Sequence, residues 1–439
     1  MKRMKTVIMA GGKGTRISSV APNIPKPMIK IQGKPVLEYE IECLRRQGFI
    51  DIILSVSYLA ECIMEYFGNG EKFGVHIEYY YEEEPIGNGG AIFKLKDRFI
   101  EDFLLLNADS IFDVDFNKFV RFHKNHNAIV TLFTHPNSHP YDSSLVIADQ
   151  DNRVERWLTK EDTKPEFYKN RVNAGLHIIS PEIFQYIKME DELIGKLNIN
   201  GEIIKVDLDR QILKPLAGTG KMFCYNSPEY VKDMGTPERY QKVCAEFKEG
   251  RVQARNLSNK QKAIFLDRDG TINQYKGFLK KTSDFELLPK VAEAIQLINE
   301  SEYLAIVVTN QPVIARGEAT MLELIDIHNK METLLGKEGA YLDQVYICPH
   351  HPDKGYPGEV PELKISCNCR KPKPGMLYKA SKDFNIDLSQ SWMIGDSQND
   401  IVAGMVAGCK TILIGAGAYG QDITVNSLLE GVQVILHIR

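Results

Sequence analysis

Two short apolar segments, each followed at once by a polar turn that contains glycine, most constrain how this chain can fold. The first is 6–10, which leads into Gly-Gly-Lys-Gly-Thr-Arg at 11–16, and the second is 263–266, which leads into Asp-Arg-Asp-Gly-Thr at 267–271. A buried parallel strand delivers a loop to the carboxyl edge of its sheet in this way. The sequence therefore predicts two sites, one at the edge of each of two sheets.

Strand-like and helix-like segments alternate on both sides of a polar, charge-rich stretch at 246–260. Expected strands lie at 52–57, 103–107, 128–133, 304–309, 391–396 and 411–415, and expected helices at 37–47, 291–299 and 321–335. This alternation predicts two α/β domains, each with a mostly parallel sheet. We place the first domain at 1–247, a linker at 248–260 and the second domain at 261–439, whose last residues from 419 form a strand and a helix.

Composition and charge limit the partners and the cellular location that we expect for the protein. The 439 residues include 54 Lys and Arg against 58 Asp and Glu, a formal net charge of −4, which gives no sign of a nucleic-acid partner. No apolar run reaches the roughly 18 residues that cross a bilayer, and the N-terminus lacks the pattern of a signal peptide. We expect a cytoplasmic protein with no membrane partner, whose eight cysteines are thiols or metal ligands.

The first turn has the features that bind a nucleotide's phosphates. Its glycines allow close approach and present backbone N–H groups, while Lys13 and Arg16 supply positive charge. Lys26 follows, held stiffly between Pro25 and Pro27. Taken singly, these features would also suit a tight turn and a surface loop.

The order of the motifs in the first half resembles that of the sugar-1-phosphate nucleotidylyltransferases. The likeness runs over about 4–245 and rests on the segments 10–16, 25–27, 33–38, 84–91, 107–110, 173–175 and 233–237. It implies a Rossmann-like domain with a mixed sheet of the glycosyltransferase-A type. It also implies in-line attack of a sugar phosphate oxygen on the α-phosphorus of a nucleoside triphosphate, with release of pyrophosphate.

The same resemblance assigns roles to individual residues. The triphosphate would be held by Gly11, Gly12, Gly14, Thr15, Arg16 and Lys26. Gly87 and Gly89 would face the base and sugar, Asn173 and Gly175 would contact the sugar, and Asp109 and Asp233 would hold Mg²⁺.

Three departures from the family pattern stand out in this half. Ala108 replaces the usual Gly before the metal-binding Asp, Lys160 lacks its usual Glu-Lys-Pro setting, and 17–20 lacks the usual Leu-x-Pro. The runs at 16–27 and 84–91 resemble guanylyl-transferring members that act on manno-configured sugars, the heptose-1-phosphate enzymes above all. We therefore expect GTP as substrate, with UTP or CTP as the alternatives.

The second half carries a different chemistry. Asp267 and Asp269 are two residues apart after a strand, so one can attack a phosphorus while the other handles the proton of the leaving group. Downstream, Thr309 can hydrogen-bond a phosphoryl oxygen, Arg370 and Lys371 can supply positive charge, and acidic residues at 396 and 400 can lie near a metal.

This order resembles the haloacid dehalogenase (HAD) superfamily phosphatases over 261–420. The resemblance makes Asp267 the nucleophile that forms an aspartyl-phosphate and Asp269 the general acid and base. Thr309 and Lys371 would stabilise the transferring phosphoryl group, and Arg370 would supply further positive charge at the catalytic site. Asp396, the Asp267 carboxylate and the Asp269 carbonyl would hold Mg²⁺.

Four soft ligands precede Arg370 and predict a structural Zn²⁺ site. They form a Cys-x-His pair and a Cys-x-Cys pair, namely Cys348, His350, Cys367 and Cys369, and we rank His351 below His350 as a ligand. The pattern resembles zinc-loop phosphatases that act on heptose bisphosphate or histidinol phosphate. Pro312, Val313 and Ser397 depart from the heptose pattern, and the loop carries extra residues near 355–358.

Both resemblances indicate manno-heptose phosphate metabolism. They imply a bifunctional enzyme that removes the C7 phosphate of heptose 1,7-bisphosphate and converts the resulting 1-phosphate into GDP-D-glycero-α-D-manno-heptose. Its partners would be small molecules: heptose phosphates and a nucleoside triphosphate. The alternatives are the same two chemistries on mannose or a modified hexose, a broad phosphatase, and a sensor without activity. The residues leave homo-oligomerisation open.

Overall fold

The computed structural model describes residues 4–12, 17, 20, 22–84, 86–186, 194, 196 and 203–437. The chain divides into two compact units. The first comprises 1–134, 146–157 and 173–256, and the second comprises 135–145, 158–172 and 257–439. Two segments that precede residue 173 therefore pack with the second unit.

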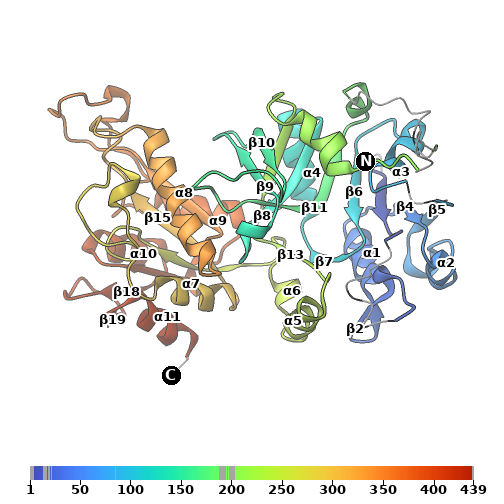
Figure 1. Cartoon of the computed structure of the whole chain (residues 1–439). Helices are drawn as coiled ribbons and strands as arrows, with labels where there is room; N and C mark the ends of the chain where they lie inside the picture. The colour runs from blue at the N-terminus through green and yellow to red at the C-terminus, as the bar shows by residue number, and fades with distance from the viewer. Residues whose placement is uncertain are drawn as a thin grey trace. The chain divides into compact units, whose positions relative to one another are not determined.

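The first unit is built on a mixed nine-stranded sheet whose central path runs β10-β9-β11-β6-β1-β4-β5, with β8 and β12 off this path (Figure 1). Within this sheet, the adjacent strands β5, β4, β1 and β6 run parallel to one another, whereas β11 runs antiparallel to β6. The strands of this sheet are β1 (Thr6–Met9), β4 (Asp51–Val56), β5 (His76–Tyr81), β6 (Phe103–Asn107), β8 (Val130–His135), β9 (Leu145–Ala148), β10 (Val154–Leu158), β11 (Val172–Ile179) and β12 (Met222–Asn226).

Smaller elements complete this half of the chain. β7 (Ser110–Asp113) and β13 (Tyr230–Asp233) form a second, antiparallel pair, and so do β2 (Lys30–Ile31) and β3 (Lys34–Pro35). The helices are α1 (Val36–Arg46), α2 (Ala60–Phe67), α3 (Gly90–Lys94), α4 (Phe116–His126), α5 (Pro237–Lys248) and α6 (Arg251–Ala254).

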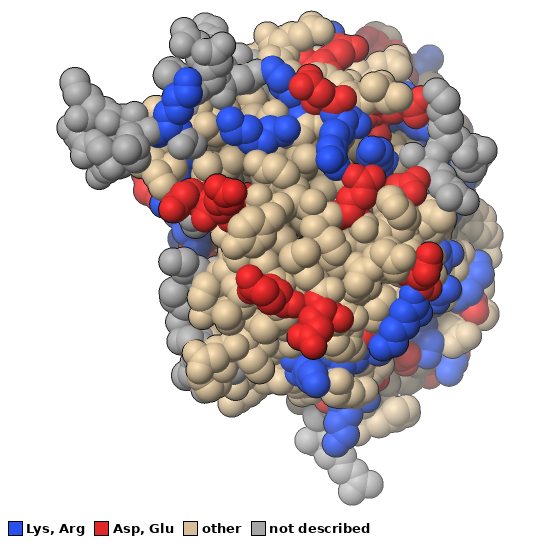
Figure 2. All heavy atoms as spheres, turned by 90° about the vertical axis from the view of Figure 1, so that its right-hand side faces the viewer, with Lys and Arg blue, Asp and Glu red and all other residues tan. Residues whose placement is uncertain are grey.

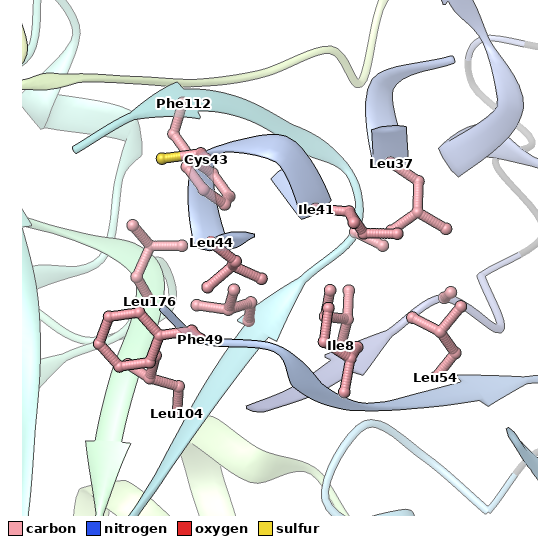
Figure 3. Packing of buried hydrophobic residues seen from close by; sticks show 14 of the residues in the cluster. Ile8, Leu37, Ile41, Cys43, Leu44, Phe49, Leu54, Leu104, Phe112 and Leu176 are labelled. Carbon is pink, nitrogen blue, oxygen red and sulfur yellow. The ribbon is translucent and has the colours of Figure 1, made fainter. Parts of the chain in front are cut away.

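Alternation along the strands explains how the main sheet buries both faces. Ile8 of β1 faces a core shared with α1, α2 and α4, whereas its neighbour Val7 belongs to a separate core on the other face. Figure 3 shows Leu37, Ile41 and Leu44 of α1 directed toward the strand residues of the first of these cores. This packing fixes the carboxyl end of β1 within the sheet.

The second unit is a doubly wound sheet of six parallel strands in the order β16-β15-β14-β17-β18-β19. Helices α7, α8 and α11 share one core with it, and α9 and α10 share the other. The strands are β14 (Lys262–Leu266), β15 (Tyr303–Asn310), β16 (Gln344–Cys348), β17 (Trp392–Gly395), β18 (Lys410–Ile414) and β19 (Ile423–Val425). The helices are α7 (Val291–Asn299), α8 (Met321–Lys337), α9 (Gly375–Phe384), α10 (Gln398–Ala407) and α11 (Leu428–Leu436).

The strand order of the second unit reverses between β14 and β17, and ligands of such sheets bind beyond the carboxyl ends of the strands at this point. The expected α/β class and the elements expected from the sequence are confirmed. The stretch expected to be a polar linker is more ordered than its composition indicated, because it contains α6 and buries Val252 and Leu257.

The described part of the chain has no helix with the length and apolar character needed to cross a bilayer. On the face drawn in Figure 2, acidic and basic side chains are interspersed around an expanse of other residues. This pattern fits the small net charge of the sequence.

Candidate active sites

The predicted nucleophile of the second unit lies where β14 ends. The backbone N–H of Asp267 donates to Ile394 O of the adjacent β17 (3.0 Å). This hydrogen bond continues the pairing of β14 with β17 one residue beyond the end of β14. Lys371 Nζ donates to Asp267 Oδ1 (2.7 Å) and to Asp400 Oδ1 (2.5 Å). Asn310 fixes the Lys371 backbone through two hydrogen bonds of 3.0 Å. Lys371 therefore links Asp267 to residues from two other segments of the chain, Asn310 and Asp400.

Asp269 is held by donors on several sides. Arg268 Nη2 lies 2.8 Å from both carboxylate oxygens, and Asn273 and Gln311 donate from 3.1 and 2.9 Å. Gln311 Nε2 also donates to Thr309 Oγ1 (2.8 Å), which links Asp269 to the predicted phosphoryl-binding Thr. The structure thus brings Asp267, Asp269, Thr309 and Lys371 to one edge of the sheet.

A carboxylate cluster beside this network fits a divalent cation. Asp267, Asp396 and Asp400 can each offer an oxygen within 4.8 Å of the others. Burial, joined by the nearby charge of Asp400, raises the pKa of Asp267 to about 7 and that of Asp396 to about 6. A hard cation would offset this mutual repulsion, and carboxylate oxygens are ligands that Mg²⁺ prefers. Asp400 was noted in the sequence only as an acid near the metal, and its bond to Lys371 also makes it an anchor of the site.

Glycine is required at two points of this edge. Gly270 has φ +84°, and a Cβ there would lie 2.0 Å from Asp396 Oδ2. A Cβ at Gly395 would lie 2.4 Å from the Asp400 side chain. Ser397 caps α10, and its amide and hydroxyl bind Asp400 Oδ2 from 3.1 and 2.6 Å.

The four predicted zinc ligands converge. The three sulfur atoms of Cys348, Cys367 and Cys369 lie 3.2–3.5 Å apart, and His350 Nδ1 lies 3.2 Å from Cys369 Sγ. Three thiols and one imidazole directed at a common point match the closed tetrahedral donor set of structural zinc. His351 instead faces Arg316 through Nε2 (3.2 Å), in keeping with its lower rank as a ligand. Arg370 Nη1 donates to His350 O (3.2 Å), so the zinc loop also holds the predicted cation.

A cation cluster that the sequence did not reveal lies beside this loop. The Arg316 guanidinium is sandwiched between the rings of Phe278 and Tyr356, 4.5 Å from each centroid, and Lys364 Nζ lies 4.5 Å from the same Tyr356 ring. Arg316 Nε and Lys364 Nζ are buried with no hydrogen-bond partner among the described residues, although Glu359 lies 3.6 Å from Lys364. Two positive charges gathered around one ring suit an anion that binds beside them.

The extra residues of the zinc loop build this cluster. Val360 N–H donates to Ala315 O (3.0 Å), and a Cβ on Gly317 would collide with Gly358 O. The loop that contains 355–358 therefore packs directly on the turn that carries Arg316, and it supplies Tyr356 and Lys364. The extra residues near 355–358 were visible in the sequence as an insertion. Their contact with the turn that carries Arg316 was not visible, because that turn lies about 40 residues earlier in the chain.

In the first unit, strand pairing joins the two predicted magnesium ligands. The register of β7 and β13 places Asp233 opposite Ser110, next to Asp109, and Met234 N–H donates to Asp109 O (3.2 Å). Lys26 Nζ donates to Asp109 Oδ2 (2.8 Å). Burial opposes ionisation of Asp233, but the Gly235 amide and the Arg239 guanidinium lower its pKa overall. Two aspartates at neighbouring backbone positions of this strand pair suit Mg²⁺ that is shared with phosphate oxygens.

The predicted sugar contacts lie on β11, beside the strand that leads to Asp109. Asn173 Oδ1 accepts from Gly175 N–H (3.3 Å) and lies 3.1 Å from His177 Nε2. Gly175 has φ +76°, and a Cβ there would lie 2.8 Å from Asn107 Nδ2. Close approach of Asn107 therefore explains the glycine, while the contact of both residues with a sugar stays a prediction.

The remaining predicted residues of this half divide into three groups. Gly11 and Gly12 follow β1 after Ala10, and a Cβ on Gly12 would meet no atom of the described residues within 4 Å. Gly87 and Gly89 pack on the segment that carries Val206, whose carbonyl would lie 2.3 Å from a Cβ at Gly87, so packing is one reason for these glycines. Gly14, Thr15 and Arg16 lie outside the described residues.

Lys160, considered for the sugar phosphate, lies in a segment of the second unit, and its role stays a prediction.

The folds and sites define a nucleotidyltransferase and a HAD-type phosphatase joined in one chain. A family model described as nucleotidyl transferase matches residues 5–249, and one described as HAD-hydrolase-like matches 368–434. The chain belongs to the nucleotidyl transferase family, and its second half is a HAD-type phosphatase.

Three curated relatives match separate halves of the chain. The D-glycero-beta-D-manno-heptose-1,7-bisphosphate 7-phosphatase of Haemophilus ducreyi is 39% identical over 179 residues, 39% of this chain and 96% of that protein. The UTP–glucose-1-phosphate uridylyltransferase of Synechocystis is 35% identical over 203 residues, 43% of this chain and 52% of that protein. The mannose-1-phosphate guanyltransferase beta-B of Xenopus laevis is 28% identical over 242 residues, 54% of this chain and 62% of that protein.

Substitution of Gly270 by Ala should inactivate the phosphatase alone. The new Cβ would displace Asp396, and misplacement by about 1 Å lowers rates on the order of 10²-fold. Phosphate and pyrophosphate release should be measured separately, with pyrophosphate release unchanged. Gly277→Ala is the control, since Gly277 has φ +77° but open space around its Cβ. Equal loss in both variants would show that backbone strain, not the Asp396 contact, is responsible.

Zinc content should depend on the four converging ligands. We expect the purified protein to contain about one zinc ion per chain by elemental analysis and Cys369→Ser to lose it, because one thiolate of a closed tetrahedral site is removed. Cys409→Ser, a buried cysteine outside the cluster, should retain the metal. Zinc-free wild-type protein would contradict the assignment.

Proposed function

We propose that this chain catalyses two consecutive steps of nucleotide-sugar synthesis. The phosphatase, at 261–439, removes the C7 phosphate of D-glycero-D-manno-heptose 1,7-bisphosphate. The nucleotidyltransferase, at 1–247, then transfers GMP from GTP to the heptose 1-phosphate and releases pyrophosphate. Residues 248–260 connect the two activities. The product is GDP-D-glycero-α-D-manno-heptose.

The phosphatase reaction uses the acid pair after β14. Asp267 attacks phosphorus, the bond to the C7 oxygen breaks, and Asp269 gives that oxygen its proton. Asp269 then takes a proton from water as the water attacks the aspartyl-phosphate, which releases phosphate and restores Asp267. Lys371, with Thr309 and Arg370, offsets negative charge on the phosphoryl group. Mg²⁺ at Asp267 and Asp396, with the Asp269 carbonyl, would add charge neutralisation.

The observation that carries the choice of a bisphosphate is the cation cluster. Arg316 lies 3.2 Å from His351 Nε2, and burial together with the positive charges of Arg370 and Arg316 lowers the pKa of that imidazole. With one phosphate at Asp267, such a cluster suits a second phosphate elsewhere on the same substrate. The Haemophilus relative, named for a heptose bisphosphate, supports this choice.

The transferase reaction needs no covalent group from the protein. A phosphate oxygen of the sugar attacks the α-phosphorus of GTP, and the bond to the bridging oxygen of pyrophosphate breaks. Lys26 and Arg16 would offset the growing charge, and Gly11, Gly12, Gly14 and Thr15 would cradle the triphosphate. Gly87 and Gly89 would lie along the base, and Asn173 and Gly175 along the sugar. Mg²⁺ at Asp109 and Asp233 would help to neutralise the phosphates.

A second candidate is the same pair of reactions on another sugar phosphate or with another base. The relatives named for mannose with a guanylyl group and for glucose with UTP favour this alternative.

One incubation separates these candidates. Heptose 1,7-bisphosphate and Mg²⁺ should give phosphate with every nucleoside triphosphate, but pyrophosphate and nucleotide-heptose with GTP alone. Asp267→Asn should abolish phosphate release while pyrophosphate release from heptose 1-phosphate persists, and Asp109→Asn should do the reverse. Turnover with UTP or with mannose 1-phosphate only would replace the proposal by the second candidate.

Removal of the Arg316 charge should weaken binding of the bisphosphate selectively. A charge-assisted hydrogen bond contributes about 1.5–3 kcal/mol, so Arg316→Gln should raise KM roughly 10- to 100-fold. KM for p-nitrophenyl phosphate, which has a single phosphate, should stay unchanged. Lys379→Gln, with an exposed side chain on α9, is the control. Equal effects on both substrates would contradict a second-phosphate site.

A further inference from the structure

Arg268, between the two catalytic carboxylates, has a fully buried side chain. A buried guanidinium is stable only when its charge and donors are satisfied. Its Nε and Nη2 face Asp269, with Nη2 2.8 Å from both carboxylate oxygens, and its Nη1 lies 3.1 Å from His328 Nε2. The guanidinium therefore spans the distance from Asp269 to helix α8.

His328 is built as a fixed hydrogen-bond acceptor for this guanidinium. It is buried on α8, and burial together with the positive charges of Arg268 and Lys169 lowers the pKa of its ring well below the usual value. Arginine only donates, so Nε2 of the neutral ring accepts and the ring proton lies on Nδ1. The geometry alone fixes this direction, because two donors cannot share the contact.

The turn of α8 that follows His328 is also held firmly. Tyr168 N–H donates to Thr333 Oγ1 (2.8 Å), Thr333 Oγ1 donates to Tyr168 O (3.1 Å), and Asn170 N–H donates to Glu332 Oε2 (2.8 Å). These partners come from 158–172, one of the two earlier segments that belong to the second compact unit. Helix α8 is thus a rigid support for the ring of His328.

We infer that Arg268 and His328 are positioning residues that orient the Asp269 carboxylate for proton transfer. His328 fixes one arm of the guanidinium, and the planar fork then fixes the plane of the carboxylate. Gln311 joins Asp269 Oδ2 to Thr309, so Oδ2 is the oxygen on the side of the predicted phosphoryl site. The inference rests on the proposed role of Asp269 as general acid and base.

The leaving group provides the test. A sugar alkoxide needs a proton as it departs, whereas p-nitrophenolate does not, and kcat/KM reports the steps up to transfer of the phosphoryl group to Asp267. His328→Leu should lower kcat/KM for heptose 1,7-bisphosphate at least about tenfold, a fraction of the 10²–10⁴-fold that general acid catalysis supplies. The value for p-nitrophenyl phosphate should change less than about twofold, since no proton is required.

Conservative variants separate positioning from folding. His328→Gln keeps an acceptor for Arg268 and should restore most of the lost activity, whereas Arg268→Lys keeps the charge without the fork and should reproduce the selective loss. Met331→Leu, a volume-conserving change at a buried α8 position, should affect neither substrate. Pyrophosphate release and thermal unfolding monitor the fold of each variant.

Each of three outcomes would overturn one step of the inference. Parallel loss on both substrates would make His328 a structural residue only, and unchanged rates in His328→Leu and Arg268→Lys would show that Asp269 needs no such support. Asp269→Asn is measured alongside. If that variant fails to discriminate between the two leaving groups, the proposed role of Asp269 is wrong, and the inference is overturned with it.

Discussion

The phosphatase site depends on the ion pairs that the buried ammonium of Lys371 forms with two aspartates. Its Nζ donates to Asp267 and Asp400, two carboxylates that would otherwise repel each other in a poorly solvated edge of the sheet. Burial opposes the charged ammonium, but the two carboxylates raise the pKa of Lys371 overall, so it stays protonated. Removal of either partner would leave a buried charge uncompensated, which is why Asn310 and Ser397 fix the network at its two ends.

The nucleotidyltransferase site repeats this arrangement with different elements. Lys26 pairs with Asp109, and Asp109 lies at the carboxyl end of a strand that neighbours β1. In both units a lysine from a distant proline-containing turn meets an aspartate at the carboxyl end of parallel strands. Each aspartate holds the positive charge of its lysine in place before substrate arrives, so the site reorganises less when phosphates bind.

The sequence predicts features that depend on neighbours along the chain and misses those that depend on distant contacts. Strand β6 and helix α7 have the predicted bounds, because apolar periodicity is local. The convergence of the four predicted zinc ligands was foreseen because the Cys and His of each pair are close in sequence. The bond between Arg268 and His328 was not found, since 60 residues separate them and neither residue type indicates the other.

Glycines show the same limit. Gly87 was predicted to leave room for the base and sugar, and the structure adds a reason that the sequence did not reveal, because a Cβ at this position would meet Val206, 119 residues later. The membership of 135–145 and 158–172 in the second unit was equally invisible, because their residues carry ordinary loop composition. Contacts such as Asn170 with Glu332 depend on the complete fold, not on any local pattern.

Regiochemistry connects the two proposed reactions. A transferase that consumes a sugar 1-phosphate requires a phosphatase that spares this group while it removes the other. A nucleophile such as the one proposed for Asp267 treats any phosphate in the same way, so the choice must come from what binds the remainder of the substrate. The cluster of Arg316 and Lys364 is suited to this task, because it can bind the spared phosphate and leave only the other within reach of the proposed nucleophile. The inserted zinc loop supplies two residues of this cluster, Tyr356 and Lys364, so a structural metal would contribute to selectivity by holding the loop in place.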